Sequence, residues 1–319
     1  MNIIPSIVIG SGFGERVVSQ ILKKNNKFDL LGIISRKNLN NNTLILKKNI
    51  NKKKIFFLAT PPFTHYHFIK KFSNEKGLIV CEKPLANNLN NAKKIIPFKK
   101  KLLCINHQLR FSKISKILKK KLNHKNINKI EILHETNHSI KNKRFSNWWS
   151  KTKFGGGQLS ALGSHLIDFA IFFSGKLKSV ECILKVNRSK KKISDDFFIL
   201  KMFSKNKCSI LIQSNSYKKT KENLEINFYT KDNKNFKIVN FDKLYKDNKL
   251  IYKEKKNKDK FLNENFWRIC FNNFINELYN KVRFKKKIPL CTVEEALYTQ
   301  RIIEVAHKSN KLQRLINIK

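Results

Sequence analysis

The sequence lacks several features that would place the protein in other classes. No apolar run among its 319 residues approaches the ~20 residues that a membrane-spanning helix needs. The first residues, Met1 to Pro5, do not have the charged-then-apolar layout of a signal peptide. The six cysteines are widely spaced without a C-x-x-C pair, so we expect buried, reduced thiols and no metal site. These absences favour a cytoplasmic protein with no membrane partner.

Acidic residues are also scarce, with 22 Asp and Glu against 68 Lys and Arg and a net charge of +46. Such a charge raises the question of a nucleic-acid partner. The excess is nearly all lysine, however, and it runs from end to end beside abundant asparagine and isoleucine, which share A/T-rich codons with lysine. A nucleic-acid reader would more often gather arginine on one face, because the guanidinium fork matches phosphate and guanine edges. Genome composition explains the charge, and we expect no nucleic-acid partner.

Apolar residues make up 41% of the chain, enough for two folded domains. Strand and helix patterns alternate through residue 106, which predicts an α/β fold with a doubly wound parallel sheet of the Rossmann type. From Val180 onward the pattern becomes that of short antiparallel strands, with a lysine-rich mobile loop expected at 240–262. We therefore predict a Rossmann domain at 1–120 and an α+β domain with a large, mostly antiparallel open sheet at 121–319, whose C-terminal helices pack back on the first domain.

A glycine-rich turn follows the first predicted strand, Ile3 to Ile9. The segment Gly10-Ser11-Gly12-Phe13-Gly14 opens a helical pattern, and this context suits a pyrophosphate at the N-terminus of a helix. The match to G-x-G-x-x-G is imperfect, because Glu15 stands where glycine or alanine belongs.

The second predicted strand, Phe28 to Ile34, ends in Ser35-Arg36-Lys37. A site for NAD usually places an acidic residue here to bind the ribose 2′-hydroxyl, whereas this chain has a hydroxyl and two cations. The segment favours NADP over NAD. The alternative is a basic turn in a basic protein.

The fourth predicted strand, Leu78 to Cys81, runs directly into Glu82-Lys83-Pro84. Proline ends the strand, so one lysine stands at the carboxyl end of a central strand, where open α/β sheets bind ligands. The alternative is a lysine on a solvated loop.

Five motifs arrive in order, and together they resemble the Gfo/Idh/MocA family, named for glucose-fructose oxidoreductase and inositol dehydrogenase. They are G-S-G-F-G, A-T-P-P-F-T-H, C-E-K-P-L-A, N-H-Q-L-R-F and, at 155–168, G-G-G-Q-L-S-A-L-G-S-H-L-I-D. The motifs span residues 7–175, and the rest of the chain fits the family's second domain only in general pattern.

The resemblance implies Lys83 and His165 as catalytic residues and a cis bond between Lys83 and Pro84. A histidine titrates near neutrality and can carry the hydroxyl proton, while Lys83 can stabilise a developing alkoxide and hold His165 in place. Asp168, one helical turn after His165, is expected to contact substrate together with Arg110 and Trp149. The residues expected to bind the cofactor are Gly10, Ser11, Gly12, Phe13, Gly14, Ser35, Arg36, Lys37, Ala59, Thr60, Pro61, His65, Glu82, Lys83, Asn106 and Gln108.

One departure from the family concerns the residue four positions before His165. Many members carry aspartate there and complete a Lys–Asp–His set, whereas this chain has Ala161. A methyl group can neither orient an imidazole nor transfer a proton. Either Lys83 and His165 suffice, or redox activity is weak or absent.

The resemblance thus implies an NAD(P)-dependent oxidoreductase, with NADP favoured, that moves hydride to or from a secondary hydroxyl of a sugar, cyclitol or nucleotide sugar. Two alternatives are a non-catalytic nucleotide-binding regulator on the same scaffold and a glycosidase or dehydratase that uses transient oxidation. In the family that the sequence resembles, the second domain's open sheet is often covered by a partner subunit, so the resemblance implies a homodimer or homotetramer formed through that sheet.

Overall fold

A computed structural model describes residues 3–36, 52–100, 102–137, 148–187, 194–218 and 221–318. It divides into two compact units: the first consists of 1–107 with 275–300, and the second of 108–274 with 301–319. The predicted boundary at residue 120 stays a prediction.

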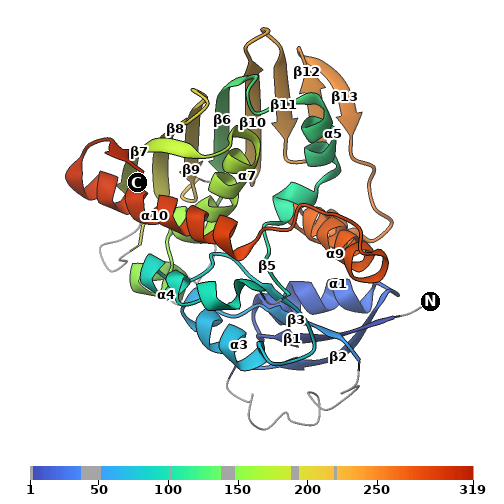
Figure 1. Ribbon diagram of the computed structural model, residues 1–319. Coiled ribbons are helices and arrows are strands. Elements are labelled where there is room, and N and C mark those ends of the chain that lie inside the picture. Colours follow the sequence, from blue (N-terminus) through green and yellow to red (C-terminus); the bar gives the residue numbers. More distant parts are fainter. Residues whose placement is uncertain are drawn as a thin grey trace. The chain divides into compact units, whose positions relative to one another are not determined.

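The first unit contains a parallel five-stranded sheet in the order β2-β1-β3-β4-β5, as the alternating strand and helix patterns predict (Figure 1). Two central strands are buried along their whole length and are apolar apart from Ser6 and Lys54, which is the composition expected of a parallel sheet covered on both faces. The strands are β1 (Ile4–Ile9), β2 (Phe28–Ile34), β3 (Lys54–Leu58), β4 (Gly77–Cys81) and β5 (Leu103–Ile105). The helices between them are η1 (Gly14–Val18), α1 (Ser19–Lys23), η2 (Pro62–Thr64), α3 (His65–Phe72), α4 (Leu89–Lys93) and η3 (Ile96–Lys100).

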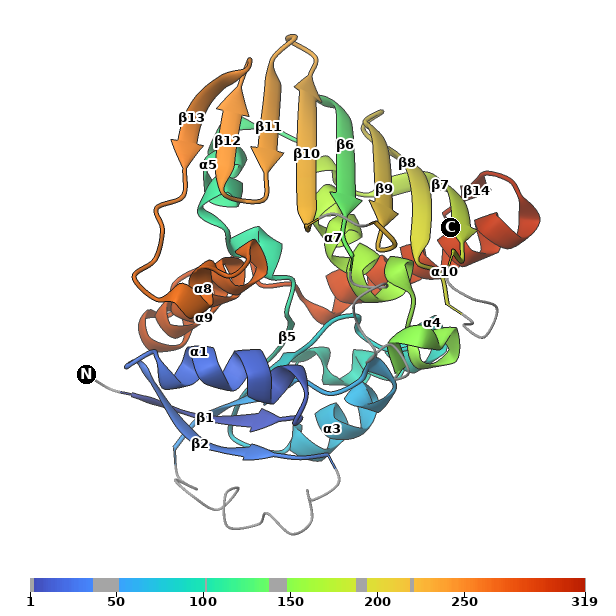
Figure 2. The same cartoon turned by 180° about the vertical axis from the view of Figure 1, so that it is seen from behind.

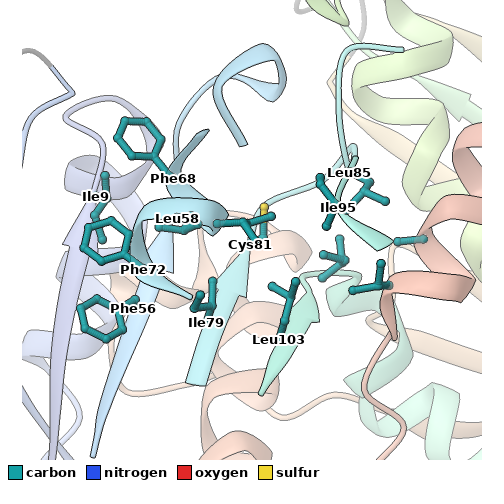
Figure 3. Close-up of a cluster of buried hydrophobic side chains, with 14 of the residues drawn as sticks. Ile9, Phe56, Leu58, Phe68, Phe72, Ile79, Cys81, Leu85, Ile95 and Leu103 are labelled. Carbon is teal, nitrogen blue, oxygen red and sulfur yellow. The ribbon is translucent and has the colours of Figure 1, made fainter. Parts of the chain in front are cut away.

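The core of this unit lies between the sheet and its helices (Figure 3). Phe56 of β3 stacks on Phe72 of α3, with ring centroids 5.0 Å apart. Residues 275–300 contribute Cys291 and Val293 to the same cluster. Thr292 and Glu295 form a capping box, because the Glu295 amide donates to Thr292 Oγ1 (3.2 Å) and the Thr292 amide donates to Glu295 Oε2 (2.9 Å).

The second unit contains a nine-stranded sheet in the order β13-β12-β11-β10-β6-β9-β8-β7-β14 (Figure 2). Every neighbouring pair is antiparallel except β6 with β9, which is parallel. The strands are β6 (Ile127–Glu135), β7 (Leu177–Lys185), β8 (Phe197–Ser204), β9 (Ser209–Asn215), β10 (Asn223–Thr230), β11 (Asn235–Val239), β12 (Lys243–Lys246), β13 (Lys249–Lys253) and β14 (Ile316–Asn317).

Burial alternates along these strands, so the sheet buries one face. Helix α7 (Ser164–Ser174) covers that face, and its Phe173 packs edge-on against Phe228 of β10 at 5.0 Å. The remaining helices are η4 (Gln108–Phe111), α5 (Lys113–Lys121), η6 (Trp148–Ser150), η7 (Thr152–Phe154), η8 (Gln158–Gly163), α8 (Lys260–Asn263), α9 (Phe266–Phe284) and α10 (Val293–Leu312). The last two contribute to both units.

The expectation of a mobile loop at 240–262 is wrong. These residues contain the hairpin of β12 and β13 followed by α8. Asp247 and Asn248 have φ of 48° and 64°, the left-handed geometry that a two-residue hairpin turn of type I′ requires. Two of the lysines that hid the alternation, Lys249 and Lys253, are exposed, while Leu244 is fully buried.

All six cysteines are buried, as predicted, and none is joined in a disulfide. Among the described residues, no helix combines the length and apolar character that crossing a membrane would require.

Candidate active site

The glycine-rich turn after β1 contains glycines that the fold requires and one that it does not. Gly10 has φ of +123°, and a Cβ there would lie 2.3 Å from the Ala59 carbonyl oxygen. A Cβ on Gly14 would lie 2.9 Å from Val8 Cγ1. Both glycines are therefore required by the packing of the turn. A Cβ on Gly12 would meet nothing within 4 Å, so the fold itself does not demand glycine there.

The open space at Gly12 suits close approach of a pyrophosphate to the backbone. Ser11, Gly12 and Phe13 are exposed and so are available to a ligand. Glu15, which breaks the sequence pattern, is also exposed. The residues present therefore fit a dinucleotide, whose hydride-carrying nicotinamide would supply redox chemistry.

We expect opposite results when Gly12 and Gly10 are each replaced by alanine. Gly12→Ala should leave the free energy of unfolding nearly unchanged and weaken NADPH binding by about 10-fold, since the methyl group would occupy ligand space. Gly10→Ala should destabilise the protein by about 3 kcal/mol, because it combines a positive φ with a backbone clash. Urea unfolding and nucleotide titration measure the two effects. Equal loss of stability in both variants would contradict this division.

The end of β2 carries the residues predicted to select the cofactor. Ser35 is half-buried and Arg36 is exposed, with the Arg36 guanidinium 5.6 Å from the centre of the Phe63 ring. Lys37 lies outside the described residues.

The turn after β3 is fixed by His65. Its Nε2 lies 2.8 Å from the Thr60 carbonyl oxygen, and its Nδ1 lies 3.2 Å from that of Leu85. The ring is fully buried, and burial lowers the His65 pKa although the two carbonyls oppose this effect. His65 thus ties the turn at Ala59, Thr60 and Pro61 to the chain that follows Pro84, which favours a supporting role over direct cofactor contact.

The E-K-P segment begins where β4 ends. The Glu82 amide donates to the Leu58 carbonyl at 2.9 Å, and Asn106 Nδ2 donates to Glu82 Oε1 at 2.6 Å. Burial raises the Glu82 pKa, against the opposing effects of the Asn106 hydrogen bond and of Lys83. The Lys83–Pro84 peptide bond is cis, as the resemblance implies.

Burial also lowers the pKa of Lys83 to about 8, although the Glu82 carboxylate opposes this shift. A lysine of this kind is charged at neutral pH and close enough to titration to exchange a proton. Perturbed lysines at the carboxyl end of a parallel sheet are candidates for function on physical grounds.

His165 lies in the second unit, directly after a π-helical turn, η8, that leads into α7. Such turns interrupt regular helices and frequently occur at functional sites. The turn is anchored by Asp195, whose Oδ2 accepts a hydrogen bond from the Leu159 amide at 2.7 Å. Gly157, at φ of +101°, makes room for that carboxylate, since a Cβ would lie 2.1 Å from Asp195 Oδ1. His165 is only 5% exposed, and Ala161 is fully buried within η8.

The two adjacent tryptophans belong to η6, which contacts the glycine-rich segment at 155–157. The Gly157 amide donates to the Trp149 carbonyl at 2.9 Å, and a Cβ on Gly156 would lie 2.3 Å from the Trp148 carbonyl oxygen. Both indoles are partly exposed. A substrate contact for Trp149 stays a prediction.

Arg110 and Asp168 contact each other. Arg110 Nε donates to Asp168 Oδ2 at 2.8 Å and Nη2 donates to Oδ1 at 2.6 Å, in a bidentate pair whose side chains are 3% and 2% exposed. This pairing joins η4 to α7 within the second unit. The predicted substrate role of both residues is untested, and the geometry favours a structural one.

Trp267, on the first turn of α9, is a residue that the sequence analysis missed. Its indole packs against the His165 imidazole with ring centroids 5.0 Å apart and planes tilted by 34°. Gln108, predicted to bind the cofactor, donates from Nε2 to the Trp267 carbonyl at 3.1 Å. No local pattern predicts these contacts, because they join distant parts of the chain.

The first unit has the parallel sheet and glycine-rich turn of a nucleotide-binding domain. The second unit is built on a large open sheet. Two family models match the chain: "Oxidoreductase family, NAD-binding Rossmann fold" over residues 5–107, and "Oxidoreductase family, C-terminal alpha/beta domain" over 119–318. The protein therefore belongs to the Gfo/Idh/MocA family of oxidoreductases, with an NAD-binding Rossmann domain. No curated protein matches the sequence.

Solved structures share this fold at low sequence identity. The WlbA dehydrogenase from Bordetella pertussis, in complex with NADH and UDP-GlcNAcA, has a TM-score of 0.78 at 13% identity, covering 100% of this chain and 98% of its own. Levoglucosan dehydrogenase with NADH and levoglucosan has a TM-score of 0.79 at 13% identity, covering 99% of both chains. GenD2 from gentamicin A biosynthesis, in complex with NAD, has a TM-score of 0.79 at 14% identity, covering 100% of this chain and 97% of its own.

Proposed function

We propose that this protein is an NAD(P)-dependent oxidoreductase that transfers a hydride between the nicotinamide and a secondary hydroxyl or ketone of a sugar, cyclitol or nucleotide sugar. The observation that carries the proposal is the place of Lys83, a partly buried lysine directly after the carboxyl end of β4, where desolvation lowers its pKa to about 8. The sugar ligands of the solved WlbA and levoglucosan dehydrogenases support the substrate class.

In the proposed reaction the nicotinamide, when bound, accepts or supplies the hydride. Lys83, in its charged form, stabilises the negative charge that develops on the substrate oxygen. His165 takes the hydroxyl proton during oxidation and returns it during reduction, because an imidazole can hold or release a proton near neutral pH. Ala161 takes no part in proton transfer, so the proposed chemistry needs Lys83 and His165 alone.

The proposed cofactor is NADP, and Arg36 is the residue that tests it. Arg36→Asp should weaken NADPH binding by about 10-fold or more while changing NADH binding much less, since a guanidinium recognises the 2′-phosphate that NADH lacks. Nucleotide fluorescence titrations measure both affinities. Lys76→Asp is the matched control, because Lys76 is exposed and lies just before β4, at the opposite end of that strand from Lys83. Equal losses for both nucleotides would contradict a 2′-phosphate site.

A panel of sugars, cyclitols and nucleotide sugars tests the reaction itself, with reduced nicotinamide as the readout. Net formation of reduced nicotinamide with at least one member supports the proposal. Product without net oxidation would instead favour a glycosidase or dehydratase, and bound nucleotide without any turnover would favour a regulator.

The proposed assembly is a homodimer or homotetramer through the outer face of the nine-stranded sheet. Leu133, Ile183 and Phe203 are 36%, 42% and 42% exposed there. They lie on that face with Ile199, which pairs with Ile183 across β7 and β8. Exposed apolar side chains on the outer face of an open sheet are typical of an interface.

Replacing Leu133 and Ile183 together by glutamate should convert the oligomer to a monomer, since burial of two carboxylates at an apolar interface is unfavourable. Light scattering after size exclusion measures the mass. Leu102→Glu is the control, as Leu102 is 61% exposed in the first unit. A wild-type monomer at micromolar concentration would contradict the proposed assembly.

A further inference from the structure

The imidazole of His165 is packed against an indole that is itself held by hydrogen bonds. Trp267 Nε1 donates to Glu222 Oε1 at 2.7 Å, a short bond to a carboxylate. The Trp267 carbonyl accepts from Gln108 Nε2 at 3.1 Å. The indole therefore has a fixed ring plane, because both its N–H and its backbone are bonded.

The same carboxylate belongs to a longer network. His134, which is fully buried, places Nε2 3.1 Å from Glu222 Oε1 and Nδ1 3.0 Å from Ser214 Oγ. Ser214 Oγ also accepts a hydrogen bond from Gln158 Nε2 at 2.9 Å. Gln158 is the first residue of η8, the turn that carries the chain into α7 and His165.

The network ends on an acceptor. Gln158 Nε2 donates to Ser214 Oγ, and the two ring nitrogens of His134 connect Ser214 to Glu222, with donor and acceptor roles set by the tautomer. The Glu222 carboxylate, which only accepts, receives the Trp267 indole N–H. The network therefore reaches His165 twice, through the backbone of η8 and through the face of Trp267.

From this geometry we propose that Trp267 is a positioning residue for His165, and that Glu222 fixes the Trp267 ring through its indole N–H. Ala161, four residues before His165, offers no side chain that could orient the imidazole. An aromatic face at 5.0 Å limits rotation of the His165 ring and excludes water from one side. The catalytic part of the inference rests on the function proposed above, whereas the placement of the ring does not.

The placement is tested by the His165 ring proton resonances, assigned by their loss in His165→Asn. In the wild type, the ring current of Trp267 should shift them from their usual positions. Trp267→Leu should abolish the shift, and Trp267→Phe should keep most of it, because phenylalanine retains a ring but not the N–H. Glu222→Gln should reduce the shift by loosening the indole. Unchanged resonances in Trp267→Leu would overturn the proposal.

Kinetics give the second readout once a substrate is found. Trp267→Leu should lower kcat by about 10- to 100-fold with KM changed less than about threefold, since misplacing a catalytic group affects the chemical step. Glu222→Gln should show a smaller loss of the same kind. Glu264→Gln is the control, because Glu264 is exposed, close in sequence to Trp267 and paired with Arg268.

A large rise in KM with unchanged kcat would overturn the positioning role, since it would make Trp267 a binding surface for substrate. Thermal melts confirm that each variant is folded. The His165 resonances test the contact with Trp267 even if no substrate is turned over. Failure of the proposed function therefore remains distinguishable from failure of this inference.

Discussion

Replacing Lys83 by methionine is expected to lower turnover by about 10³-fold while NADPH binding changes by less than about threefold. Methionine keeps the length of the side chain and removes its charge. The lost interaction is made to charge that exists only in the transition state, so kcat falls and binding is largely spared. Single-turnover measurements and nucleotide titration on the same preparation separate the two. Lys76→Met serves as the control.

The pH profile of the wild type sharpens this test. Because burial lowers the Lys83 pKa to about 8, the ammonium loses its proton as pH rises through that value. Turnover that depends on the charged form should therefore fall as pH rises through 8. Lys83→Met should lack this descending limb. A rise in turnover through pH 8 would show instead that the neutral amine acts as a base.

Breaking the Arg110–Asp168 pair should have the largest effect on stability. Both side chains are almost fully buried and joined by two hydrogen bonds. Asp168→Asn leaves the guanidinium buried without its counter-charge, which should cost about 3–5 kcal/mol in the free energy of unfolding. Urea denaturation measures this loss.

The double variant Arg110→Met with Asp168→Leu should recover most of that stability, because replacing both partners by apolar groups removes the unpaired charge. Asp168→Glu is a milder variant that keeps the carboxylate. If Asp168→Asn is instead as stable as the wild type and raises KM, the residues bind substrate, as the sequence analysis expected.

Local motifs predicted the parts of the site that are formed by a few consecutive residues. The strand before Glu82, the proline after Lys83 and the glycines of the first turn each constrain a few consecutive residues. The structure has β1, β2 and β4 within one residue of the predicted strand bounds. Gly10 and Gly12 look alike in the sequence, however, and only their surroundings distinguish a glycine that the fold requires from one that it does not.

Contacts between residues far apart in the chain could not be predicted from local sequence patterns. Asp168 and Arg110 were both expected at the substrate because each belongs to a motif of the family that the sequence resembles, and nothing in the local pattern shows that they neutralise each other. Trp267 belongs to an ordinary amphipathic helix pattern, so its contact with His165 left no signal. The hairpin at Asp247 and Asn248 was obscured by exposed lysines, although its turn residues are a usable signal.

Formation of reduced nicotinamide by wild type and Lys83→Met, each loaded with NADP and offered the same substrate panel, tests the central claim most directly. We predict that the wild type reduces the nucleotide with at least one member of the panel, and that Lys83→Met binds NADP equally well but loses this reaction. Two results would contradict the account. One is wild-type protein that binds NADP but fails to reduce it with every substrate in the panel, and the other is a methionine variant that retains full activity.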